Sequence, residues 1–189
     1  MVLTTIDLRG VSVPDYRAVV PRAGFDVAAA TRVVQPIIDA VAQRGAAALA
    51  EFSQRFDHVV PASFRVPTDA LTQALAELEP QVRAAFEVSI DRRRRVAEAE
   101  AAHQPVRVEL APGAIVEQRL VPVGRVGLYV PGGLAPLASS VLMNVVPAQV
   151  AGVSSIAVAS PPQAEFGGLP HPSILAVCAL LGVEEVYAV

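Results

Sequence analysis

Two apolar runs about thirty residues apart constrain the fold of this chain more than any other feature of its sequence. The first, residues 125–130, is rich in β-branched and aromatic residues and ends at Pro131-Gly132-Gly133. An apolar segment of helical length follows, and the second run, residues 155–159, ends at Ser160. Strand, glycine loop, helix and strand in this order predict a βαβ unit with parallel strands.

The same spacing occurs once more along the chain. Gly152 and Gly182 each stand where a helix ends and each precede an apolar run. A third strand is therefore expected at residues 185–189, after a covering helix over residues 173–181. Each crossover should be right-handed, which gives three successive parallel strands.

The first hundred residues place their apolar side chains at helical spacing. They predict a helix that begins near Thr31 and that Gly45 ends, a second helix over residues 46–56, and a third that Thr68 caps. Pro80 then restarts a longer helix that runs to about residue 102. These helices need a surface on which to pack.

Between the helices and the first strand, residues 106–110 and 115–120 flank a turn at Pro112-Gly113, which predicts a β-hairpin. The predicted fold class is therefore α/β. A helical arm over residues 1–105 precedes the hairpin and an incomplete parallel sheet of βαβαβ type over residues 106–189. Three parallel strands make a thin sheet with unpaired edges, so we expect the chain to be the first part of a longer protein.

Composition excludes several classes of function. The 18 acidic residues outnumber 15 basic ones, all of them arginine, which argues against a general nucleic-acid binder. No apolar run approaches the length of a membrane span and the N-terminus does not resemble a signal peptide, so we expect a cytoplasmic protein. The single cysteine, Cys178, lies in an apolar helical stretch and is expected to be a buried thiol.

The carboxyl end of the first strand is the expected ligand site. There, backbone N–H groups and the start of the next helix face the same crevice. The residues alone leave other roles open, because Pro-Gly-Gly is equally consistent with a plain tight turn, a tyrosine in a parallel strand is more often packed in the core, and serines at a helix start are caps. The candidate residues are Tyr129, Pro131, Gly132, Gly133, Ser139 and Ser140.

Other chemistry is weakly indicated. The glycines do not have the spacing of a dinucleotide-binding or Walker motif. The three histidines, His58, His103 and His171, are too scattered to predict a zinc site, and His171 is expected to be solvated. The arginine run at residues 92–95 is followed by acidic residues, which favours a solvated helix face with pairs such as Arg94 with Glu98; an anion site is the alternative.

Four stretches closely resemble the histidinol dehydrogenase family: VGRVGLYVPGG, SSVLMNVVPAQVAGV, ASPPQ and RGAAALAEFSQRFD. A fifth, IDLRG at residues 6–10, resembles the start of the family's actinobacterial members. The resemblance implies a Rossmann-like fold and NAD-dependent oxidation of L-histidinol to L-histidine. It makes Tyr129 an NAD contact, with the other candidate residues at neighbouring crevice positions. Ala138, where the family often has proline or an aromatic residue, and Arg119, where it has tryptophan, are departures from its pattern.

The resemblance also implies what this chain lacks. Family members are about twice as long, and the zinc ligands, the Glu-His acid/base pair and most histidinol contacts belong to their later portion. We therefore expect the NAD-side, N-terminal portion of an enzyme that is a homodimer when complete, with no catalytic or metal-binding residue here and no activity alone. The alternative is a non-catalytic nucleotide-binding or assembly module derived from that enzyme.

Overall fold

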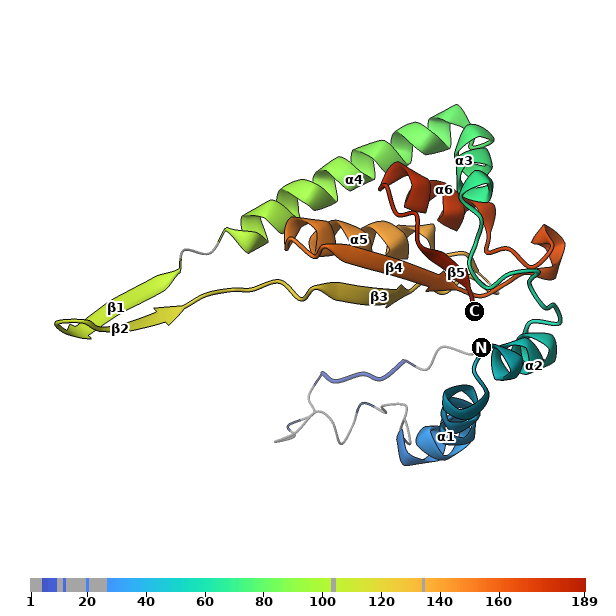
Figure 1. Ribbon diagram of the computed structural model, residues 1–189, viewed down its shortest axis with the longest axis horizontal. Helices are drawn as coiled ribbons and strands as arrows, with labels where there is room; N and C mark the ends of the chain where they lie inside the picture. Colours follow the sequence, from blue (N-terminus) through green and yellow to red (C-terminus); the bar gives the residue numbers. More distant parts are fainter. Residues whose placement is uncertain (1–4, 10–11, 13–19, 21–26, 103–104, 134) are drawn as a thin grey trace. The chain divides into compact units, whose positions relative to one another are not determined.

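The computed structural model describes residues 5–9, 12, 20, 27–102, 105–133 and 135–189 (Figure 1). The chain forms two compact units, Met1–Gly45 and Ala46–Val189. Most of the predicted arm before residue 27 lies outside the described residues, and so does His103, one of the three scattered histidines.

The first unit contains one described helix, α1, over Val27–Arg44. It begins four residues before the predicted start, and Gly45 ends it in the left-handed conformation, with φ at +56°. This conformation is the usual helix terminator because glycine adopts it without a steric penalty. The prediction that Gly45 ends the helix is confirmed.

The second unit begins with three helices, α2 over Ala46–Phe56, α3 over Thr68–Ala76 and α4 over Pro80–Ala101. Pro80 occupies the first turn of α4, where a missing backbone N–H leaves no hydrogen bond unmade. The prediction for Thr68 is wrong. Pro67 is the N-cap of α3 and supplies no side-chain hydrogen bond, so Thr68 is the first helical residue.

The predicted βαβαβ unit is confirmed. Strands β3 (Arg125–Tyr129), β4 (Ser155–Ser160) and β5 (Val186–Ala188) form a parallel sheet in the order β3-β4-β5. Helix α5 (Ala138–Val150) joins the first pair, and a short 3-10 helix (Ala164–Phe166) and α6 (Pro172–Leu180) join the second. The two α-helices pack side by side on one face of the sheet.

The β-hairpin is also confirmed. Strands β1 (Val106–Ala111) and β2 (Ala114–Gln118) pair antiparallel around Pro112-Gly113. Gly113 has φ at +80°, as the second central residue of a proline-glycine turn requires. Every residue of both strands is exposed.

The core of the second unit joins its helices to the sheet. Buried valines of α5, the fully buried Ile174 and Val177 of α6, and Val158 and Val186 of the sheet form one cluster. Helix α3 packs on α6 and α4 packs on α5 (Figure 1). Helices α3 and α4 therefore belong to the same compact unit as the sheet, while the predicted functional division at residue 105 stays a prediction.

One polar connection crosses the packed helices. Arg94 Nη2 of α4 donates to Gln149 Oε1 of α5 at 3.1 Å, and Gln149 Nε2 donates to the carbonyl oxygen of Leu181 at 2.7 Å. That carbonyl follows the last turn of α6, where backbone oxygens lack helical partners. Arg94 thus binds Gln149 where the sequence predicted a pair with Glu98, and Arg93 pairs with Glu100 at 3.1 Å.

Candidate functional site

Tyr129 is the last residue of β3 and its side chain is 61% exposed. Its neighbour Val130 is fully buried on the opposite face of the strand. The interpretation of Tyr129 as a core residue is therefore wrong. The register aligns Tyr129 with Ala159 and Ala159 with Tyr187, so the two tyrosines lie on one face of the sheet with a small residue between them.

The Pro131-Gly132-Gly133 loop is buried at its central residue and exposed at the other two. Gly132 is buried, and a Cβ atom there would lie 2.6 Å from Ser160 Oγ and 2.9 Å from Ile174 Cδ1. Gln163 Nε2 donates a hydrogen bond to the Gly132 carbonyl oxygen. Pro131 and Gly133 are exposed. Gly132 therefore packs the loop against the sheet end, while its neighbours face solvent.

The serine pair lies inside the first turn of α5. The helix begins at Ala138, and its N-cap is Leu137, whose side chain makes no capping hydrogen bond. The prediction that Ser139 and Ser140 cap the helix is therefore wrong. Ser139 is exposed, and the Ser140 carbonyl oxygen accepts a hydrogen bond from Asn144 Nδ2 at 2.8 Å.

Loop and helix start are nevertheless close, because the Leu137 N–H donates to the Pro131 carbonyl oxygen at 3.1 Å. The start of α5 therefore lies close to the carboxyl end of β3, although residues 130–137 separate the two elements in sequence. Backbone N–H groups in this arrangement attract anions. The structure thus brings the start of α5 to the same sheet end as Tyr129.

Two residues of this region, Ser160 and Gln163, were not predicted from the sequence as part of the site. Ser160 ends β4 beneath Gly132; its side chain is fully buried and its Oγ has no hydrogen-bond partner among the described residues. Gln163 belongs to the following loop and holds the Gly132 carbonyl. Their position after a predicted strand end was the available signal, but the contacts with Gly132 depend on tertiary packing.

The same sheet face carries a polar cluster nearer its amino end. Arg125 Nη2 lies 2.5 Å from Glu185 Oε1, and Arg125 Nη1 donates to Ser155 Oγ at 2.7 Å. Tyr187 donates its hydroxyl hydrogen to the same carboxylate at 2.8 Å. The Arg125 guanidinium, followed by the Tyr187 hydroxyl, lowers the pKa of Glu185, and the hydrogen bond to Glu185 raises the pKa of Tyr187. The cluster ties the three strands together.

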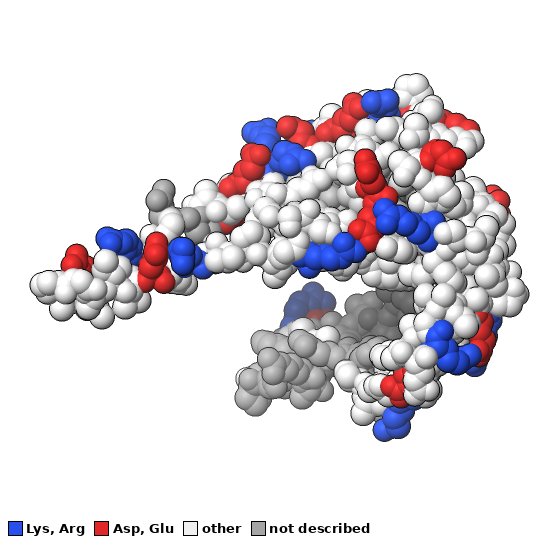
Figure 2. Space-filling model, viewed as in Figure 1, with Lys and Arg blue, Asp and Glu red and all other residues white. Residues whose placement is uncertain are grey.

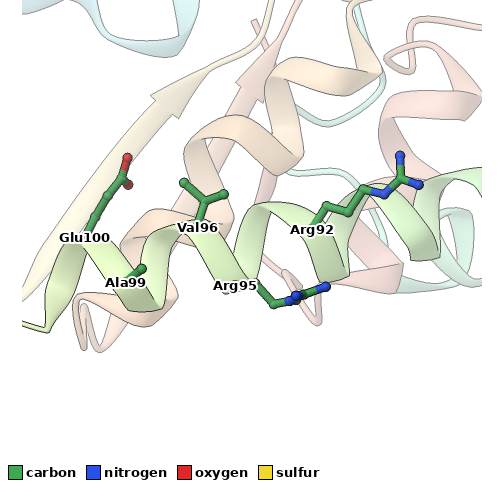
Figure 3. A pocket seen from close by; sticks show the side chains of 5 residues that line it. All are labelled: Arg92, Arg95, Val96, Ala99 and Glu100. Carbon is green, nitrogen blue, oxygen red and sulfur yellow. The ribbon is translucent and has the colours of Figure 1, made fainter.

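The arginine run presents a mixed surface. Figure 2 shows acidic and basic side chains interspersed along α4. Arg92, Arg95 and Glu100 line a shallow hollow on this helix, and Figure 3 shows that the two guanidinium groups do not converge on one point. Arg92 and Arg95 are exposed and match the predicted solvated helix face rather than an anion site, whereas Arg93 and Arg94 are half-buried.

His171 differs from its prediction as a solvated residue. It is half-buried, it is the N-cap of α6, and its Nδ1 accepts a hydrogen bond from the Ser173 N–H at 3.2 Å. Its ring lies edge-on to Phe166, with centroids 5.1 Å apart. Among the described residues, no group of three or more histidine, cysteine or acidic side chains could hold a metal ion.

Cys178 is fully buried in α6, as expected from the sequence, and burial raises the pKa of its thiol to about 12. The unfolded thiol, with a pKa near 9, loses its proton first. Rising pH therefore favours the unfolded state, and the free energy of unfolding should fall by about 1.4 kcal/mol per pH unit above that value.

Urea denaturation at pH 8 and pH 10 measures this slope. Cys178→Ala is the matched control, because it removes the thiol and should lose about 1.4 kcal/mol less than the unchanged chain over that interval. Equal losses in the two proteins would mean that the buried thiol does not contribute to the alkaline decline.

No described helix is long and apolar enough to cross a membrane.

The model of the histidinol dehydrogenase family matches residues 20–189. A histidinol dehydrogenase from Cutibacterium acnes is 64% identical over 190 aligned positions, which cover 99% of this chain and 43% of the relative. One from Nocardia farcinica is 58% identical and is covered to 42%.

A solved structure gives the same result. The crystal structure of histidinol dehydrogenase from Elizabethkingia anophelis superposes with a TM-score of 0.78 at 26% identity. The match covers 89% of this chain and 37% of that one, so the chain spans less than half the length of the relatives it matches. The sequence motifs, the parallel sheet and these matches agree: the chain belongs to the histidinol dehydrogenase family.

Proposed function

We propose that this chain is the N-terminal, NAD-side portion of an enzyme that oxidises L-histidinol to L-histidine. The exposed ring of Tyr129 at the carboxyl end of a parallel strand is the observation that carries the proposal. Ligands of open α/β sheets bind outside the carboxyl ends of their strands. Family membership supports the choice of reaction, and the match over almost the whole chain does not favour a free-standing module.

The residues at this sheet end fit a dinucleotide. An exposed tyrosine offers an aromatic face and a hydroxyl group. Pro131 and Gly133 form the open side of the loop, and the exposed Ser139 lies in the first turn of α5, whose start favours a phosphate. The Ser140 N–H donates to the Leu137 carbonyl oxygen at 2.8 Å, so Ser140 would contribute its hydroxyl group. Gly132 acts indirectly, because its lack of a Cβ lets the loop pack closely against Ser160. NAD, when bound, would supply the hydride acceptor, while these residues would bind and orient it.

The remaining chemistry is assigned to the part of the family polypeptide that this chain does not cover. Proton abstraction and polarisation of the alcohol oxygen by zinc need a base and metal ligands. We place both outside these 189 residues, together with most contacts to L-histidinol. The complete enzyme is proposed to be a cytoplasmic homodimer, in which residues 1–105 form the helical, dimerising region and residues 106–189 begin the cofactor domain.

A chimaera tests the role of Tyr129. This chain would be joined to the portion of the Cutibacterium acnes relative that it does not match. Tyr129→Ala should raise the KM for NAD by about 10-fold or more, through loss of an aromatic contact. Because the side chain is exposed, the free energy of unfolding should change by less than about 0.5 kcal/mol.

Met143→Ala is the matched control, since Met143 of α5 is 54% exposed and is not a candidate contact. It should leave the KM for NAD unchanged. An unaltered KM in the Tyr129 variant would refute the cofactor assignment. Histidinol-dependent NADH formation by the 189-residue chain alone would refute the division of labour.

A further inference from the structure

Both backbone groups of Gln163 are engaged within the loop after β4. Its N–H donates to the Leu169 carbonyl oxygen at 3.0 Å, and its own carbonyl oxygen accepts from the N–H groups of Phe166 at 3.1 Å and Gly168 at 2.8 Å. Gln163 is also the N-cap of the short 3-10 helix, with an extended backbone at φ −124° and ψ 132°. The direction of its Cα–Cβ bond is therefore fixed by the loop itself.

The Gln163 side chain crosses to the loop after β3 and holds one carbonyl group there. Its Nε2 donates to the Gly132 carbonyl oxygen. The preceding carbonyl oxygen, that of Pro131, accepts from the Leu137 N–H at 3.1 Å. Two successive carbonyl groups of the loop are thus held, the first by its own segment and the second by the loop after the neighbouring strand. Only the second depends on a side chain.

The bond to Gly132 also sets the direction of the next N–H group. A peptide unit is planar and trans, so its C=O and N–H bonds point to opposite sides. Because the Gly132 oxygen points toward Gln163, the N–H of Gly133 points away from it. Gly133 is exposed, and within the described part of the chain its N–H has no hydrogen-bond partner. This peptide therefore presents an unpaired donor on the side opposite to Gln163.

The peptide between the two glycines is the part of the loop that could reverse most easily. A reversal of the peptide plane changes ψ of the first residue and φ of the second, and glycine permits both changes because it has no Cβ. Gly133 has no atom within 4 Å of the position of a Cβ, so packing does not restrain it. Gly132 is confined by Ser160 and Ile174, but these contacts do not hold its carbonyl group. That group is held by Gln163.

We propose that Gln163 is a positioning residue for ligand binding, which keeps the Gly132–Gly133 peptide in the orientation where the Gly133 N–H can donate to an oxygen of the ligand. The assignment rests on the proposed function, in which this ligand is NAD, and the acceptor is an oxygen of its diphosphate. Backbone N–H groups in loops are common partners of phosphate groups. A donor that is held in place before the ligand arrives lowers the cost of ordering the loop on binding.

Gln163→Met in the chimaera defined above tests the role in binding. Methionine keeps the length of the side chain and removes its hydrogen-bond donor. The KM for NAD should rise by about 3- to 10-fold, as the loss of one hydrogen bond implies, while kcat and the KM for L-histidinol stay unchanged. Glu165→Met is the matched control, because Glu165 is an exposed residue of the same loop. It should leave all three constants unchanged.

Nuclear magnetic resonance of the 189-residue chain, without cofactor, follows the peptide itself. In the unchanged chain the Gly133 amide should give one signal without relaxation dispersion. In Gln163→Met it should show a second signal or relaxation dispersion, since the peptide then exchanges between two orientations. The Val130 amide is the internal control, because its bond to the Ala159 carbonyl oxygen at 2.8 Å does not involve Gln163. Identical behaviour of the Gly133 amide in the two proteins would overturn the proposal.

The two measurements distinguish the role of Gln163 from the proposed function. A Gly133 amide that becomes mobile while the KM for NAD stays unaltered would overturn the role in binding. The NAD site would still stand if Tyr129→Ala raises that KM, and it would fail as well if neither substitution alters it. The resonance measurement does not need the chimaera to fold, so it can refute the positioning of Gly133 in either case.

Discussion

Gly168→Ala is expected to lower the free energy of unfolding by about 2–5 kcal/mol, through two costs that act together. Gly168 is buried and has φ at +86°, a conformation that residues with a Cβ rarely adopt. An added Cβ would also lie 2.8 Å from Pro61 Cα, which is a backbone atom and cannot rotate away. The measurement is the midpoint and slope of urea denaturation.

Gly167→Ala is the matched control for this prediction. Gly167 also has positive φ, at +63°, but no atom lies within 4 Å of a Cβ built there. It should therefore lose only the conformational part, about 1–2 kcal/mol. Equal losses in the two variants would mean that Pro61 moves aside at little cost, and that the close approach does not stabilise the chain.

The Gly168 variant also bears on the candidate site. The Gly168 N–H donates to the Gln163 carbonyl oxygen at 2.8 Å, and the Gln163 side chain holds the Gly132 carbonyl. A shift of this loop would thus reach the open side of the Pro131–Gly133 turn through two hydrogen bonds. Residues after β4 support the loop after β3, which is a tertiary relation between neighbouring strand ends.

The architecture was predictable because its signals are local. The βαβαβ order follows from apolar runs at a constant spacing, and the hairpin follows from Pro112-Gly113, whose turn conformation depends on those two residues. Gly45 ends α1 for the same kind of reason. Such features need no knowledge of what packs against them.

The caps were not predictable to the residue. Thr68 and Ser139 each lie one or two positions inside a helix, and the true N-caps, Pro67 and Leu137, make no side-chain hydrogen bond. A capping residue is favoured only where its side chain is needed to satisfy the first N–H groups. Helices α3 and α5 both pack against other helices, and this packing outweighs the local preference for a capping side chain.

The exposure of Tyr129 depends on which face of the sheet the helices cover. Parallel strands are usually buried on both faces, which favoured a core position for the tyrosine. In this chain α5 and α6 pack on the face of Val130, and Arg125 and Tyr129 lie on the other. Sequence alternation along β3 separates these two sets, but only the packing of the helices shows which set is buried.

Gly132→Ala is expected to lower the free energy of unfolding by about 1–3 kcal/mol, because its Cβ would enter a filled space. The nearest atom, Ser160 Oγ at 2.6 Å, belongs to a fully buried hydroxyl group without a hydrogen-bond partner among the described residues. Ser160→Ala removes that atom together with its unpaired polar group. Alone, it should therefore leave stability unchanged or raise it by up to about 2 kcal/mol.

A double-mutant cycle measured by urea denaturation separates packing from backbone effects at this loop. If the clash with Ser160 causes the loss, the double variant should recover at least about 1 kcal/mol relative to the sum of the single changes. Additive effects would show instead that Ile174, whose Cδ1 lies 2.9 Å from the same position, sets the limit. In either case the loss of stability comes from the contacts of Gly132 with Ser160 and Ile174. Gly133→Ala, whose Cβ would have no atom within 4 Å, should therefore lower the free energy of unfolding by less than about 0.5 kcal/mol. That difference would establish that the loop is closely packed at Gly132 and has free space at Gly133.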